Sequence, residues 1–169
     1  RVIIINGVDE KKIGEVSGVK NKIINGKFEF DDNSEIKSIV LGLTLADRLG
    51  VIKGDTVFLA SSSGMESSML QFSNPKVMKL KIVGIFESNN KDYDNFYAYI
   101  SLSAAKELFN TNYSTIEVRL NDINNSLKVK KKIENVLPAG FTVLTWYDLH
   151  KDLYSIMKIE RWVAYIILC

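Results

Sequence analysis

The chain has 169 residues, 46% of them hydrophobic, with 10 Gly and 2 Pro, so it has enough apolar sequence for one globular unit or two small lobes sharing a core. Its 22 Lys and Arg residues nearly balance 20 Asp and Glu residues, and a net charge of +2 gives no reason to expect nucleic acid as a partner. The single histidine, His150, and the single cysteine, Cys169, cannot supply the three converging ligands of a His/Cys metal site, and they exclude an internal disulfide.

The first half of the chain alternates short predicted strands and helices. Apolar runs predict strands at 1–5, 27–30 and 38–42, with a helix over 9–24 that is interrupted by glycines. A helix is predicted over 43–49, and Gly50 suits the left-handed position after its last turn. A strand then follows at 54–61.

The second half continues this pattern. Residues 79–88 alternate apolar and polar side chains, which predicts a half-buried strand that pairs with 95–101 across the turn 89–94. The remaining elements are predicted as a helix at 102–110, a strand at 114–120, a lysine-rich helix at 125–136, a strand at 141–146 and a long helix from Tyr147. We therefore predict an α+β fold: a mixed, largely antiparallel sheet with flanking helices, a protruding hairpin loop and a C-terminal helix leading into a membrane helix.

The last residues suggest a membrane boundary. The apolar run after Arg161 covers roughly 12 Å as a helix, against about 30 Å of bilayer hydrocarbon. Trp162 and Tyr165 lie beside Arg161 and Lys158, a grouping typical of a membrane interface. With no initiator Met at the start, we expect the chain to be a fragment that stops inside a membrane helix. An amphipathic helix that docks on the core is the alternative.

No group of residues predicts catalysis. Glu87, Asp92 and Asp94 lack the glycine of a calcium loop and indicate a solvated hairpin turn. Lys128, Lys131 and Lys132 share a helical face without an aromatic stacking platform, which favours a solvated face. The serines at 61–63 and 67–68 lie some eighty residues from His150, and no glycine-rich phosphate loop is present. We expect no enzyme activity, no metal and no cofactor. A hydrolase that brings His150 to the serines is the remaining catalytic alternative.

Four stretches together resemble one family. In order, "SIVLGLTLADRLGVIKGDTVFLAS", "KLKIVGIFES", "YDNFYAYISLSAAKELF" and "TWYDLHKDLYSIMKIERWVAYIIL" resemble the extracytoplasmic domain of ABC-transporter permeases of the lipoprotein-releasing type, in the MacB- and FtsX-like superfamily. The likeness covers nearly the whole chain, including "VIIINGVD" at the start.

The resemblance implies a place in a transporter. Such permeases sit in the bacterial inner membrane, with this domain facing the periplasm between the first and second membrane helices. The implied partners are a cytoplasmic ATPase subunit reached through the membrane part, a second permease subunit, and a periplasmic lipoprotein carrier with its lipoprotein cargo. Residues 1–157 would be the periplasmic domain, and 158–169 the start of a truncated transmembrane helix joined to it by a rigid rod that includes Ile156, Met157, Ile159 and Glu160. A further lobe, built from residues nearer the first membrane helix, would be mostly absent.

The stretch "MESSMLQFSNPKVM" at 65–78 is the candidate partner loop. In one of the two permease subunits the corresponding loop is a hook that captures the carrier, and flexible apolar side chains suit such a role. The predicted partner-binding residues are Met65, Met69, Leu70, Phe72, Pro75 and Met78. The predicted membrane-junction residues are Lys158, Arg161, Trp162 and Tyr165.

Several alternatives remain open. The stretch lacks the Gly-Arg-Pro-like turn of the hook and is closer to the partner subunit, and its Met69, Leu70 and Phe72 could instead pack on the sheet or on the further lobe. The whole chain could also belong to a MacB-like export permease, to an FtsX-like signalling permease, or to a stand-alone soluble binding module.

Overall fold

A computed structural model of the chain describes residues 2–61, 76–110, 115–138 and 140–168, without the side chains of 152–155, 158 and 168. The chain divides into unit 1, Arg1–Val118, and unit 2, Arg119–Cys169. The elements of unit 1 are β1 (Ile4–Val8), α1 (Glu10–Val16), η1 (Gly18–Lys22), β2 (Ile23–Gly26), β3 (Lys37–Gly42), α2 (Leu43–Leu49), β4 (Thr56–Ala60), β5 (Val77–Phe86), α3 (Lys91–Phe96), β6 (Tyr97–Ser101) and α4 (Leu102–Phe109). Those of unit 2 are η2 (Ile123–Asn125), α5 (Ser126–Glu134), α6 (Trp146–Leu149) and α7 (Lys151–Leu168).

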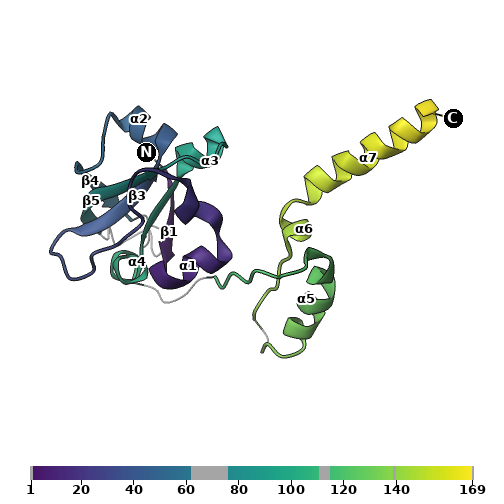
Figure 1. Cartoon of the computed structure of the whole chain (residues 1–169). Helices are drawn as coiled ribbons and strands as arrows, with labels where there is room; N and C mark the ends of the chain where they lie inside the picture. Colours follow the sequence, from purple (N-terminus) through teal and green to yellow (C-terminus); the bar gives the residue numbers. More distant parts are fainter. Residues whose placement is uncertain (1, 62–75, 111–114, 139, 169) are drawn as a thin grey trace, which may run out of the picture. The chain divides into compact units, whose positions relative to one another are not determined.

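Unit 1 is built on a six-stranded mixed sheet (Figure 1). The strand order is β1-β6-β3-β5-β2, and β4 pairs with the same edge of β5 as β2. The β1–β6 and β3–β5 pairs are parallel, whereas the β2–β5, β3–β6 and β4–β5 pairs are antiparallel. The predicted α+β class with a mixed, largely antiparallel sheet is confirmed.

Local signals in the sequence set several helix ends in unit 1. Ser101 accepts a hydrogen bond from the Ala104 N–H and caps α4, and Asn90 caps α3 in the same way. Gly50 has a φ of 66° after the last turn of α2, as predicted, because a residue without Cβ adopts the left-handed conformation at little cost.

The sheet has one apolar cluster on each face. On one face Ile39, Leu80 and Ile100 are fully buried under α2 and α4, whose Leu45 and Leu108 join the same cluster. The other face carries an aromatic cluster that covers only part of the sheet. Its buried members are Val19, Phe28, Val40, Phe86 and Tyr99.

A bulge in β5 decides which side chains at its C-terminal end face each of the two clusters. Ile39 pairs with Ile82, but the next residue, Val40, pairs with Gly84, so Val83 is an extra residue. Because one inserted residue reverses the side-chain alternation, Ile85 joins the first cluster and Phe86 the aromatic cluster.

Three predictions for the N-terminal part of unit 1 were wrong in detail. The first strand starts at Ile4, three residues later than predicted. The helix predicted over 9–24 is divided into α1, η1 and strand β2. Residues 27–30 form no strand, and Phe28 is instead buried in the aromatic cluster.

The predicted hairpin between 79–88 and 95–101 was also wrong. Strand β6 pairs with β1 and β3, and β5 has β3, β2 and β4 as neighbours. The predicted turn 89–94 is mostly helix α3, in which Asp94 is buried and accepts a hydrogen bond from the Ser88 N–H. The Asp94 carboxylate therefore binds the backbone just before α3 and is not part of a solvated turn.

Unit 2 contains helices and irregular segments. Thr145 and Asp148 form a reciprocal capping box at α6, and Lys130 of α5 pairs with Asp148 at 2.8 Å. The Lys130 hydrogen bond, followed by those from Thr145, lowers the pKa of Asp148. The predicted strands at 114–120 and 141–146 do not form over the residues that the structure describes, although the lysine-rich helix and the long C-terminal helix are present.

Candidate partner-binding surface

The β4–β5 hairpin presents an exposed face in unit 1. The pairs Thr56↔Lys81, Phe58↔Lys79 and Ala60↔Val77 place six side chains on one side of the hairpin, and all six are exposed. Phe58 is 72% exposed and Val77 57% exposed, whereas on the opposite side β5 is buried in the core and β4 packs partly buried against it. The face is thus apolar at one end and basic at the other.

This face leads directly to the predicted partner loop. The Ser61 N–H donates to the Lys76 carbonyl at 2.9 Å, so the ladder continues up to the two residues that flank 62–75. Met65, Met69, Leu70, Phe72 and Pro75 lie outside the described residues, and their predicted role stays a prediction. Met78 is 8% exposed in β5 and belongs to the core cluster, so its side chain is placed for packing.

Sequence reasoning overlooked Phe58 and Val77. Phe58 lies in the predicted strand 54–61, where a phenylalanine is normally assigned to the buried side, and Val77 lies in the stretch 65–78 but was not among its predicted partner-binding residues. The exposure arises because the aromatic cluster covers the sheet only beyond the Val83 bulge. No signal in the sequence indicates how far the aromatic cluster extends over the sheet.

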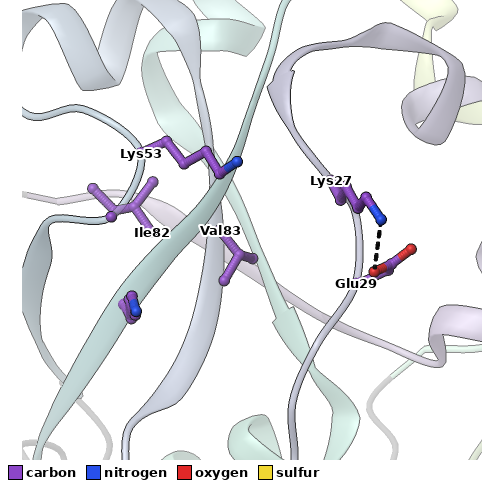
Figure 2. A pocket seen from close by; sticks show the side chains of 7 residues that line it. Lys27, Glu29, Lys53, Ile82 and Val83 are labelled. Carbon is purple, nitrogen blue, oxygen red and sulfur yellow. Dashed lines mark ion pairs between the residues drawn. The ribbon is translucent and has the colours of Figure 1, made fainter.

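A shallow cavity of about 400 Å³ lies in unit 1 near the basic end of this face (Figure 2). Its lining includes three lysines, one carboxylate and the partly buried Val83, together with Ile82, whose side chain is fully buried in the core cluster. Lys27 and Glu29 form an ion pair of 3.8 Å in which both side chains are largely exposed. This cavity was not predicted.

The predicted membrane-junction residues lie on α7. Trp162 is 70% exposed and Tyr165 60% exposed, and Arg161 is exposed between Glu160 and Trp162. Lys158 lies on the same helix, but its side chain is not described. The helix continues without a break through the predicted boundary at 157/158. Across the described parts of the chain, we find no helix with both the length and the apolar character needed to cross a membrane.

Groups that could carry chemistry are not assembled in the described structure. Over the described ranges, His, Cys, Asp and Glu side chains form no group of three that could hold a metal ion. Burial raises the pKa of the Tyr99 hydroxyl, which contacts the Tyr93 hydroxyl inside the aromatic cluster. His150 contacts the Trp146 ring in unit 2 and Ser61 lies in unit 1, so the hydrolase alternative stays untested.

The described structure is that of an α+β domain with an exposed, partly basic hairpin face. Its sequence matches the MacB-like periplasmic core domain over residues 2–136, and the chain belongs to this family.

The chain is also similar to named proteins. It is 28% identical to the lipoprotein-releasing system transmembrane protein LolC of Buchnera aphidicola, over 95% of this chain and 42% of that protein. It is 24% identical to LolC of Xylella fastidiosa, over 98% of this chain and 40% of that protein. The chain thus spans about two fifths of the length of these relatives. The predicted resemblance to the periplasmic domain of lipoprotein-releasing permeases is confirmed.

Proposed function

We propose that the chain is the non-catalytic periplasmic domain of an inner-membrane ABC-transporter permease that releases lipoproteins toward the outer membrane. The observation that carries this proposal is the family match over residues 2–136 together with similarity to LolC along nearly the whole chain. The domain would relay motion driven by a cytoplasmic ATPase and would pair with a second permease subunit. Residues 158–169 would begin a membrane helix.

The exposed hairpin face supports a docking role for this domain. Phe58 and Val77 are exposed apolar side chains on the paired strands β4 and β5, and the predicted partner loop connects the same two strands. Exposed apolar side chains beside a loop rich in Met, Leu and Phe suit capture of a periplasmic protein, because burying such side chains on binding releases water. We propose the periplasmic lipoprotein carrier as that protein.

We expect Phe72→Asp to reduce retention of the lipoprotein carrier at least tenfold without changing the melting temperature. Burying a phenylalanine contributes about 1.5–3 kcal/mol, and about 1.4 kcal/mol corresponds to a factor of ten. The measurement is a pull-down of purified carrier by the immobilised chain, with a thermal melt of each variant. Phe141→Asp is the matched control, because Phe141 is 65% exposed in unit 2.

Two results would contradict this expectation. A large fall in melting temperature would show that Phe72 packs in the core. Unchanged carrier retention would remove the loop from the binding surface. If the unaltered chain also failed to retain the carrier, the proposed carrier-binding role would fail, which would leave the other subunit of such a permease or an export or signalling permease.

We expect a chain that ends at Met157 to be as stable as the full chain and more soluble. The truncation removes exposed apolar side chains, among them Trp162, Ile166 and Ile167. The measurements are urea unfolding, followed by circular dichroism, and the concentration at which each protein precipitates.

A full-length control tests whether the gain in solubility comes from losing the apolar side chains or from losing the helix itself. Trp162→Ser, Ile166→Ser and Ile167→Ser together should reproduce most of the gain in solubility. Loss of stability on truncation would show that the segment packs on the domain, which would contradict its proposed role as a membrane junction.

A further inference from the structure

Lys27, Lys53 and Lys81 lie around one shallow cavity in unit 1. The cavity has a volume of about 400 Å³ and is also lined by Glu29, Gly54, Ile82 and Val83. Figure 2 shows Lys53 on one side of Val83 and the ion pair between Lys27 and Glu29 on the other. The three lysines come from three separate segments of the chain, so only the folded sheet brings them together.

The backbone around the cavity is fixed by hydrogen bonds to two residues of β5. The Lys27 N–H donates to the Val83 carbonyl at 3.1 Å, and the Gly54 N–H donates to the Ile82 carbonyl at 2.8 Å. A Cβ at Gly26 would lie 2.1 Å from the Val83 oxygen, so β2 approaches the bulge as closely as its backbone permits. The segments that carry Lys27 and Lys53 are thus both hydrogen-bonded to β5 at the Val83 bulge.

The charges around the cavity are not balanced. Glu29 is the carboxylate among the lining residues, and it lies 3.8 Å from Lys27 in a solvent-exposed pair that another anion can displace at little cost. Within the described residues no carboxylate lies within ion-pair distance of Lys53 or Lys81. An anion between these ammonium groups would offset their mutual repulsion.

The lining combines this cationic rim with apolar surface. The partly buried Val83 lines the cavity, and the methylene stems of the lysines add further apolar surface. A free inorganic anion can use only the rim, whereas an amphiphilic anion can use both surfaces. A volume of about 400 Å³ falls within the range of small-molecule sites, about 300–1,000 Å³.

We propose that this cavity binds the phosphate-bearing headgroup of an anionic glycerophospholipid. Lys53 and Lys81 contact the phosphate, Lys27 exchanges Glu29 for it, and the glycerol and first acyl carbons lie on Val83 and the lysine stems. The proposal goes beyond the transport role and does not depend on it, because it rests only on the residues that line this cavity.

The test uses the complete 169-residue chain and dihexanoyl phosphatidylglycerol below its micelle-forming concentration. The readout is the chemical shift of the Gly54 and Val83 amides, which lie in the cavity and are remote in sequence from the apolar helix α7. We expect saturable shifts at both amides, weakened by added salt because the ammonium groups are exposed. Inorganic phosphate should bind at least tenfold more weakly. Equal affinity for inorganic phosphate would overturn the assignment to a lipid headgroup.

Charge-reversal variants test the named lysines. Lys53→Glu with Lys81→Glu should weaken phosphatidylglycerol binding at least tenfold. Lys11→Glu with Lys91→Glu changes the net charge equally at two exposed lysines outside the cavity and should change the affinity less than twofold. If both double substitutions weakened phosphatidylglycerol binding equally, the proposal would be overturned, because binding would then depend on net charge alone. An absence of shifts at Gly54 and Val83 in the unaltered chain would overturn it as well.

Discussion

Phe86→Ala is expected to lower the free energy of unfolding of unit 1 by about 3–5 kcal/mol. Phe86 is fully buried, and its ring lies 5.6 Å from the Tyr99 ring and 5.9 Å from the Tyr93 ring, both in edge-on contact. Removing the ring leaves a cavity between the sheet and the segment that carries Phe28, and close-packed neighbours fill such a space only in part.

The measurement is urea unfolding followed by near-ultraviolet circular dichroism, to which the packed rings of Tyr93, Tyr97 and Tyr99 in unit 1 contribute. Tryptophan fluorescence reports unit 2 instead, since Trp146 and Trp162 both lie there. Phe58→Ala is the matched control. Because Phe58 is 72% exposed, we expect a change within about 0.5 kcal/mol. If both substitutions lowered the free energy of unfolding equally, Phe58 would not be exposed as described, and the hairpin face would not be a docking surface.

Gly42→Ala is expected to destabilise unit 1 by about 2–3 kcal/mol, although it adds a single methyl group. Gly42 ends β3 and precedes α2 with a φ of −69°, a conformation open to any residue, so backbone strain is not the reason. A Cβ there would lie 2.2 Å from the Asp94 carbonyl oxygen and 2.7 Å from its Cα. Because these are backbone atoms of α3, the helix itself must move.

Gly18→Ala provides the control for this prediction. A Cβ at Gly18 would meet no atom within 4 Å, and its φ lies outside the positive range. We expect its effect on the urea midpoint to be within the error of the measurement. A harmless Gly42→Ala would show that α3 does not pack against the end of β3 as described.

Local sequence signals predicted the elements that depend on neighbouring residues. The α2 helix and its left-handed Gly50, the helix capped by Ser101, and the half-buried character of β5 all follow from patterns within about ten residues. Family membership was also predictable from ordered segments of sequence, and the match over residues 2–136 confirms it.

Strand pairing was less predictable, since it depends on contacts between distant residues. The short connection between β5 and β6 suggested a hairpin, but β6 lies between β1 and β3. Residues 115–120 and 141–145 have strand-like patterns and form no strand in the described structure, because a strand needs a paired neighbour.

The sequence by itself determined the α+β class, the positions of the best-capped helices and the family, because propensity, caps and alternation act over short distances. Only the tertiary structure decided which hairpin face is exposed and which lysines meet. The Val83 bulge and the limited extent of the aromatic cluster leave Phe58 and Val77 in solvent, while β2 and the turn before β4 bring Lys27 and Lys53 to Lys81. Both outcomes depend on long-range pairing, which no local stretch of the chain encodes.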